Sequence, residues 1–562
     1  MFYTTPEFDL WKQSNVEGWH IKYYKGLGTS SAKEAKEYFS NLPRHRIPFG
    51  PMTEADGQLI HNCFSKKEVQ FRKTWISGYE EGTHMNFDTD EMSYSDFVDK
   101  EYIIMAVKSN MRGIPHVMDG LKPSQRKILF ACLKRKLHAE IKVAQLAGYT
   151  SEHASYHHGE ASLNGAIINM AQDFVGSNNI NLLTPNGQFG TRLMGGKDAA
   201  SPRYVFTQLS AVTELIFHPD DAALYTYLND DGQQIEPAHY VPVIPMLLVN
   251  GSSGIGTGWS STIPSYNPGD IIDNLRTLLS DSAPKRMVPW FRGFTGQVVP
   301  VQPGRWHTRG TFRWSTATKL EITELPVGTW TNKYKEMLEK QLEGSGSVKK
   351  GHVLHVACDY TDTAVHFTVT MSTEAAAKYQ SNEADLVKAF KLSSTVDTNN
   401  MHAFDKDGRL QKYNSELDIL QQFFERRLEL YQARKLHQIK CVKKQCSVLT
   451  DKVRFINMVT DGSFQFRGRE KAVLMSELTR LQFVGEGFDY LLNMPLWNLT
   501  DEKSQSLALE LTKYEQELDQ LHLISAKHMW LHDLDNLERK MRTSKKRSLP
   551  ATTTSNKVQR VK

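Results

Sequence analysis

The sequence has few cysteines and no long apolar run. Five cysteines occur in 562 residues, an odd number without the spacing of a disulfide framework, which indicates a reducing compartment. No apolar stretch approaches the length of a membrane span, and the mean hydropathy is -0.47, so we expect a soluble protein with no membrane partner. The polar first residues do not form a secretory signal. The net charge of +5 is small for this length, so any nucleic-acid surface must be local.

The sequence also lacks a recognisable metal or nucleotide site. Residues 254–259 (Gly-Ile-Gly-Thr-Gly-Trp) have the glycines of a nucleotide loop without the P-loop lysine or the dinucleotide spacing. An exposed Ile255 among these glycines suits a wedge between base pairs, and the alternative is a buried isoleucine beside a tight turn. His437, Cys441 and Cys446 could share one helix as metal ligands, but such thiols are more often packing residues, so we predict no metal site.

The first half of the chain shows a pattern typical of DNA-binding domains. Apolar spacing predicts helices at 125–137 and 161–174, and the Asn-, Gly- and Pro-rich stretch 178–203 predicts an extended wing. Helices followed by a β-wing form a winged helix, which places a helix in a DNA groove. The following region, 213–400, mixes helices with short strands, which we predict at 241–249 and 364–371.

Two apolar seams near the end of the chain predict an antiparallel coiled-coil arm. Apolar residues recur in steps of three and four in two stretches separated by a glycine-containing insert, at Ile439, Val442, Cys446, Leu449, Val453 and Ile456, and at Leu507, Leu511, Tyr514, Leu518 and Leu521. An ordinary pair of amphipathic helices is the alternative. Residues 539–562 contain many Lys and Arg and no acid, so we predict a disordered tail that serves as a nuclear address, a nonspecific DNA contact or only a solvated end.

One turn-rich segment places Arg203 directly before Tyr204. A tyrosine in this position can act as a nucleophile, and a guanidinium beside it can hold a phosphodiester through paired donors. The alternative is a tyrosine that only packs in an apolar strand. His157 and His158 could accept a proton from a phenol, although a histidine pair is more often structural.

Basic residues near the start of the 125–137 helix form a second candidate phosphate site. A helix N-terminus attracts anions through its free N–H groups, and cations gathered there are costly until an anion joins them. The alternative is a solvated basic face. The residues of this cluster are Arg112, Lys122, Arg126 and Lys127.

These segments together resemble the eukaryotic type IIA DNA topoisomerases, which pass one duplex through another. The motifs are spread over nearly the whole chain apart from the tail: YYKGLGTS at 23–30, DGLKP at 119–123, QRK at 125–127, KVAQLAG at 142–148, YHHGE at 156–160, GQFGTR at 187–192, SPRY at 201–204, GIGTGW at 254–259 and MPLW at 494–497. The resemblance implies an α+β multidomain fold. Its parts are the end of a TOPRIM-like domain (1–50), a connector (51–94), a winged-helix domain with the catalytic tyrosine (95–212), an α/β tower domain (213–410), an antiparallel coiled-coil arm with a dimer gate (411–540) and a basic disordered tail (541–562).

The resemblance also implies roles for individual residues. Tyr204 would attack a DNA phosphate and become linked to the 5′ end, Arg203 would stabilise the pentacovalent transition state, and His158, with His157 beside it, would accept the proton. Because the aryl phosphodiester keeps much of the energy of the broken bond, religation would need no ATP. The DNA contacts implied are Arg44, His45, Lys25, Gly26, Arg112, Lys122, Arg126, Tyr156, Ile255 as the intercalating wedge, and Lys391 within the DNA-facing segment 391–400.

The family uses further parts that this sequence does not contain. A glutamate and an Asp-x-Asp-x-Asp run position Mg²⁺, and a separate domain hydrolyses ATP; the chain begins after that run, so the resemblance implies both cofactors only in a full-length enzyme. We therefore expect an N-terminally truncated breakage-reunion core that binds duplex DNA, forms a homodimer and cleaves poorly alone. The alternative is a non-catalytic DNA-binding and dimerisation fragment. The basic tail favours the nucleus, with the mitochondrion as the alternative location.

Overall fold

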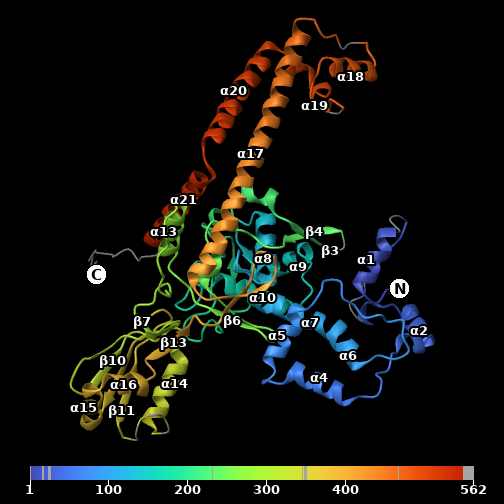
Figure 1. The fold of residues 1–562 in the computed structure, drawn as a ribbon. Helices are drawn as coiled ribbons and strands as arrows, with labels where there is room; N and C mark the ends of the chain where they lie inside the picture. Colours follow the sequence, from blue (N-terminus) through green and yellow to red (C-terminus); the bar gives the residue numbers. More distant parts are fainter. Residues whose placement is uncertain are drawn as a thin grey trace, which may run out of the picture.

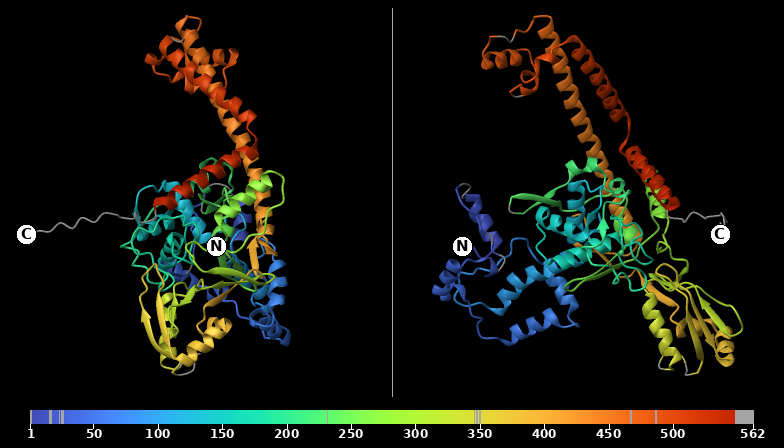
Figure 2. Two further views of the ribbon diagram at one scale, coloured as in Figure 1. Left: turned by 90° about the vertical axis from the view of Figure 1, so that its left-hand side faces the viewer. Right: turned by 180° about the vertical axis from the view of Figure 1, so that it is seen from behind.

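A computed structural model describes residues 2–14, 18–22, 24, 27–230, 232–344, 346, 348, 351–465, 468–485 and 487–547. Figure 1 shows a central body from which a helical N-terminal part, a β-rich lobe and a long arm project. The two turned views in Figure 2 show the same three projections. This mixed architecture confirms the predicted α+β multidomain class. Among the described helices, none has both the length and the apolar character that crossing a bilayer requires.

Short capped helices make up the N-terminal part. Ser31 and Thr53 each begin a helix with a capping box, in which the cap side chain accepts from a backbone N–H one turn later and the carboxylate there accepts from the cap N–H. The elements are α1 (Thr5–Ser14), η1 (Leu27–Thr29), α2 (Ala32–Ser40), α3 (Leu42–His45), α4 (Glu54–Phe64), α5 (Val69–Ser77), α6 (Tyr94–Asp96), η2 (Phe97–Tyr102) and α7 (Ile103–Gly113).

Helices with fully buried faces build the central body. The helices predicted at 125–137 and 161–174 are confirmed as α8 and α10, with slightly earlier bounds. Pro123 occupies the first turn of α8, where no N–H partner is lost. The elements are α8 (Pro123–Arg135), β1 (Ile141–Lys142), α9 (Val143–His153), α10 (Glu160–Ala171), β2 (Phe206–Thr207), α11 (Thr213–Ile216), η3 (Pro219–Leu224), β3 (Tyr227–Asp230), β4 (Gln233–Pro237), α12 (Met246–Asn250), β5 (Ser252–Ile255), β6 (Ser260–Ile263), α13 (Pro268–Leu279), β14 (Met401–Phe404) and β15 (Leu410–Tyr413).

The strand predicted at 241–249 is wrong. This apolar run lies in the core, but its first half is irregular and its second half is α12. Pro242 and Pro245 lack the backbone N–H that a central strand must donate, so the run cannot join a ladder. Burial alone does not distinguish a strand from an irregular core segment.

Antiparallel strands and three helices form the β-rich lobe. Its four-stranded sheet has the order β11-β12-β10-β9 and its three-stranded sheet the order β13-β8-β7. The strand predicted at 364–371 is present as β12, although it begins three residues later. The elements are β7 (Gln297–Gln302), β8 (Arg305–Arg309), β9 (Phe312–Trp314), β10 (Lys319–Ile322), α14 (Thr331–Leu342), β11 (Val353–Cys358), β12 (Phe367–Met371), α15 (Thr373–Ser381), α16 (Glu383–Ala389) and β13 (Ser393–Asp397).

The arm consists of α17 (Glu416–Thr460) and α20 (Asp501–Leu523), which run side by side in opposite directions (Figure 1). Leu449, Ile456 and Leu507 pack together between the two helices, with Val453, Leu511 and Tyr514 against them, which confirms this part of the predicted seams. The far end of the arm carries α18 (Lys471–Arg480), α19 (Asp489–Leu492) and η4 (Leu496–Asn498) around a separate small core. The last helix, α21 (Ala526–Arg547), returns to the body.

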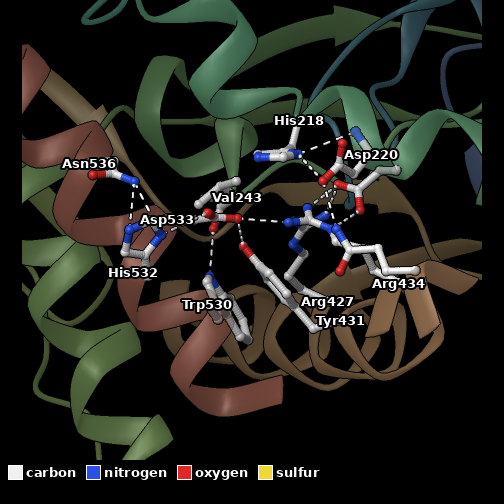
Figure 3. A network of polar contacts seen from close by, with 12 residues as sticks. His218, Asp220, Val243, Arg427, Tyr431, Arg434, Trp530, His532, Asp533 and Asn536 are labelled. Carbon is white, nitrogen blue, oxygen red and sulfur yellow. Dashed lines mark hydrogen bonds and ion pairs between the residues drawn. The ribbon is translucent and has the colours of Figure 1, made fainter. Parts of the chain in front are cut away.

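A buried network of charges joins the base of the arm to the body (Figure 3). Asp221 in η3 accepts hydrogen bonds of 2.7 Å from Arg427 and from Arg434 of α17, and Arg434 also donates to Asp533 of α21 at 2.8 Å. The Trp530 indole of α21 donates to a backbone carbonyl of the body at 3.0 Å. Burial favours a higher pKa for Asp221, but the Arg427 and Arg434 charges hold it below the usual range.

The predicted disorder of residues 539–547 is wrong, because they continue α21. Trp530, Leu534 and Leu537 are fully buried in the body, and Met541 packs against the same core one turn later. A helix anchored by such a face propagates into a polar stretch at little cost. Residues 548–562 lie outside the described part.

Candidate functional site

Tyr204 stands on the surface of the body. Its side chain is 70% exposed, so the alternative of a tyrosine packed in the core is wrong. The residue after it, Val205, is buried and begins the path into β2, and its carbonyl accepts a 3.1 Å hydrogen bond from the N–H of Val143. The carbonyl of Pro202 accepts a 3.2 Å bond from the N–H of Ala144. The backbone on both sides of Tyr204 is therefore fixed to the start of α9, while the phenol faces solvent.

The loop that leads to Tyr204 is held by side chains that sequence reasoning missed. Gln172 at the end of α10 donates to the carbonyls of Phe189 and Gly196 at 2.9 and 3.2 Å. The Asp198 carboxylate accepts from the N–H and the hydroxyl of Thr191 at 2.9 and 2.6 Å. No local pattern identifies Gln172, because its partners lie 17 and 24 residues away. A loop restrained in this way keeps a nucleophile in one position at low entropic cost.

Arg203 and the two histidines lie in different surroundings. The Arg203 guanidinium carbon is 5.8 Å from the centre of the Tyr204 ring. His157 Nε2 lies 2.9 Å from a carboxylate oxygen of Asp230 in β3, and the His158 ring meets Tyr156 edge to face at 5.4 Å. Within the described residues no hydrogen bond joins either imidazole to Tyr204, so the role of His158 as proton acceptor stays a prediction.

Arg126 is not a surface residue, and its predicted direct contact with DNA is wrong. The residue is 7% exposed, and its guanidinium donates to both carboxylate oxygens of Asp119 at 2.7 and 3.1 Å. Burial favours a higher pKa for Asp119, but the Arg126 charge and hydrogen bonds hold it below the usual range. Asp119 also accepts from the N–H of Tyr240. Buried charges need such partners, so the pair supports the core beneath the surface.

Arg112, Lys122 and Ile255 gather around the β5–β6 hairpin. The Lys122 ammonium donates to the carbonyl of Ser253 at 2.8 Å, and burial lowers its pKa. Arg112 is exposed at the last turn of α7, next to Gly113, which touches the backbone of Ile255. Ile255 is 84% exposed, so the alternative of a core isoleucine is wrong. The hairpin thus presents a large apolar side chain beside two cations.

The remaining predicted contacts lie farther from Tyr204 along the chain. Arg44 donates to the carbonyl of Phe87 at 2.8 Å, and His45 shares a 2.6 Å hydrogen bond with the Tyr3 hydroxyl, so both also hold the N-terminal part together. Lys391 is exposed in the lobe at the edge of a hollow of about 860 Å³ that also contains Lys333 and Lys388. Lys25 and Gly26 lie outside the described residues.

Potential metal ligands lie scattered in the described part of the chain. Within these residues no group of three or more His, Cys, Asp or Glu side chains is placed to hold a metal ion. The Cys441 thiol lies 3.4 Å from His437 Nε2, but nothing else completes a ligand set there. The groups of this site are therefore a phenol, guanidinium and ammonium groups, imidazoles and one apolar wedge.

Comparisons with known proteins identify the family of the chain. Residues 112–535 match the family model of the A subunit of DNA gyrase/topoisomerase IV, and residues 1–110 match that of the C-terminal associated domain of TOPRIM. The chain is 40% identical to DNA topoisomerase 2 of Candida albicans over 95% of this chain and 40% of that protein, and 42% identical to DNA topoisomerase 2-alpha of Gallus gallus over 95% of this chain and 37% of that protein. It thus spans about 40% of the length of such relatives.

A solved structure matches over nearly the entire length. The crystal structure of the Plasmodium falciparum topoisomerase II DNA-binding, cleavage and re-ligation domain superposes with a TM-score of 0.85 and 41% sequence identity. The match covers 98% of this chain and 78% of that chain. The similarity therefore extends through the body, the lobe and the arm.

Proposed function

The chain belongs to the DNA gyrase/topoisomerase IV family, and we propose that it is the part of a type IIA topoisomerase that cuts and rejoins duplex DNA. The observation that carries this proposal is the 70% exposed Tyr204 on a loop fixed at both sides to buried structure. A nucleophile needs an accessible oxygen and a restrained position, and this loop provides both.

In the proposed reaction the Tyr204 oxygen attacks a backbone phosphorus. A bond forms between that oxygen and phosphorus, the bond from phosphorus to the deoxyribose 3′ oxygen breaks, and the DNA 5′ end becomes linked to the protein. The phenolic proton passes to a nearby base, for which His158 is our candidate, and the departing 3′ oxygen is protonated in turn. Arg203 donates to the phosphate oxygens as charge develops. Religation reverses these steps.

The proposed DNA path follows exposed Arg112 and Lys391 and half-buried Lys122 over the body and the lobe. Arg112 and Lys122 beside the β5–β6 hairpin hold the backbone near the wedge, and Lys391 contacts a more distant part of the duplex. Ile255 enters between two base pairs and bends the DNA. Tyr156, His157, Arg44 and His45 are further candidate contacts.

We propose that the active form is a homodimer, because each strand of the duplex needs its own tyrosine. Mg²⁺ and ATP are the cofactors that membership of the type II topoisomerases implies, and the steps above use only groups of this chain. We place the protein in the nucleus with DNA as its partner. A DNA-binding and dimerisation module is the second candidate function, because exposed Arg112 and Ile255 can hold a duplex without any cleavage step.

The experiment that tests the proposal is covalent capture of DNA. The chain is incubated with supercoiled plasmid and Mg²⁺, denatured with detergent and analysed for protein-linked DNA, with Tyr204→Phe as the control that lacks only the hydroxyl. We expect a low yield of adduct that disappears in the variant. Adduct that persists in Tyr204→Phe eliminates this nucleophile, and its absence from both proteins, with duplex binding intact, supports the second function.

A further inference from the structure

The β5–β6 hairpin that carries Ile255 is held unusually closely by the end of α7. A Cβ added at Gly254 would overlap the carbonyl oxygen of Gly113, and one added at Gly113 would overlap the carbonyl oxygen of Ile255. Both obstacles are backbone atoms, which cannot move aside as a flexible side chain could. The two chain segments therefore approach at a distance that only glycine permits on either side.

A buried amide fixes the turn that follows the wedge. Asn110, 1% exposed in α7, donates to the carbonyl of Thr257 at 3.1 Å. A Cβ at Gly256 would overlap the Asn110 side-chain oxygen, so this glycine also makes room for the amide. The hairpin is thus bonded to α7 just after Ile255 and touches it just before.

Two further elements contact the remainder of the turn. In α5 the Lys73 ammonium lies 4.6 Å from the centre of the Trp259 ring, and Arg72 packs close to Gly258. The Trp259 ring also meets His402 of β14 edge to face, with the ring centres 5.2 Å apart. The exposed Ile255 therefore projects from a turn that is restrained by α5, α7 and β14.

We propose that Asn110, Gly113, Gly254 and Gly256, which we call the hairpin contact, are positioning residues that hold Ile255 rigid enough to bend DNA. The inference rests on the proposed function, in which Ile255 inserts into the duplex. Separating two stacked base pairs costs a few kcal/mol per step. A side chain on a mobile loop would move aside before the bases part, whereas one bonded to a buried helix transmits the force.

The test separates bending from binding. A duplex labelled at its ends with a fluorescent donor and acceptor is titrated with wild-type chain, Ile255→Ala, Asn110→Ala and Gly254→Ala, so that affinity and end-to-end distance come from the same experiment. Gly148→Ala is the matched control, since nothing lies within 4 Å of a Cβ at this glycine of α9. We expect Asn110→Ala to lower the ratio of bent to straight complex about fivefold, the factor that matches loss of one hydrogen bond of about 1 kcal/mol.

A double variant distinguishes positioning from a general loss of stability. If the hairpin contact acts through the wedge, Asn110→Ala adds no further loss of bending to Ile255→Ala. Additive losses, or a bend in Asn110→Ala and Gly254→Ala equal to that of wild type while Ile255→Ala is impaired, overturn the inference alone. Undiminished bending in Ile255→Ala removes the wedge from the proposed function itself, and neither result depends on Tyr204.

Discussion

Replacing Asp221 by asparagine tests whether the buried charge network holds the arm on the body. The carboxylate accepts from both Arg427 and Arg434, which are 0% and 2% exposed. In the Asp221→Asn variant both guanidinium groups keep their charges but meet a neutral amide, so Arg427 loses its carboxylate partner while Arg434 keeps only Asp533. Neither can regain hydration without displacing α17, because both are enclosed by the body and α21.

The size of the effect follows from this burial. Removing one partner of a buried ion pair costs about 3–5 kcal/mol because a buried charge is left without compensation. A cooperative unit of 150–250 residues loses about 2–4 °C per kcal/mol, so the melting temperature of the body with the arm base should fall by roughly 6–20 °C. Differential scanning fluorimetry measures this fall, and hydrogen exchange of peptides from the first turns of α17 locates it.

The matched control removes an exposed carboxylate that joins another helix, α21, to the body. Asp281 bonds Lys527 at 2.7 Å with its side chain 82% exposed, and its φ of 55° is one that asparagine adopts readily. Such a pair contributes at most about 1 kcal/mol. If Asp221→Asn lowers the melting temperature no more than Asp281→Asn, or leaves exchange in α17 unchanged, the reasoning about the network is refuted.

The pH dependence of this effect has a definite sign. The pKa of Asp221 is lower in the folded protein than in the unfolded chain, so its contribution to stability is present above the unfolded value, near 3.9, and is lost as pH falls through the folded value. The difference between wild type and Asp221→Asn should therefore stay constant from about pH 8 to about pH 5. A difference that shrinks within this interval would contradict the assigned ionisation.

Three other predictions concern single residues. Burial lowers the pKa of His116 to about 3, so as pH drops below about 6.5 the unfolded chain binds a proton that the folded protein does not, and stability falls. The His116→Gln variant should therefore show a smaller change of melting temperature with pH between about pH 6.5 and pH 4. An unchanged pH dependence would disprove this role of His116. Arg126→Ala should cost about 3–5 kcal/mol of stability because Asp119 is left buried without its ion-pair partner, and thermal melting should show the loss as a lower melting temperature. A variant that keeps its stability and loses only DNA affinity would instead support direct contact between Arg126 and DNA. Arg112→Ala should keep the melting temperature and reduce the salt dependence of duplex binding by about one unit of slope, whereas an unaltered slope would remove it from the DNA path.

Local patterns in the sequence were sufficient for several elements and for the candidate nucleophile. The spacing of Ile128, Leu129 and Cys132 identified a helix face, and these side chains are fully buried in α8. The seams of α17 and α20 depend on steps of three and four, which any long helix pair must display. Tyr204 can be predicted as the nucleophile from the sequence because the turn-forming residues and Arg203 directly precede it in the chain.

Patterns that depend on distant partners misled sequence reasoning. Arg126 looked like part of a basic cluster, but it is seven residues from an aspartate that shares its burial. The end of α21 looked like a solvated tail, since nothing in its own composition shows that Trp530 and Leu534 enter the core of the body. Gln172 restrains the loop before Tyr204 by donating to backbone carbonyls far along the chain. Every residue has a backbone carbonyl, so the sequence does not show which ones accept these hydrogen bonds.

The sequence by itself determined which residues can react and that the strongly periodic segments α8, α10, α17 and α20 become helices, because chemical identity and periodicity are local properties. The tertiary structure decided which of the cations are buried in ion pairs and which lie at the surface. It paired Arg126 with Asp119 and Arg427 with Asp221 inside the protein, and it left Arg112 and Ile255 at the surface on an α7–hairpin contact made possible by Gly113 and Gly254. Burial and close approach arise only when segments far apart in the chain meet, since the free energy of a charge depends on everything that surrounds it.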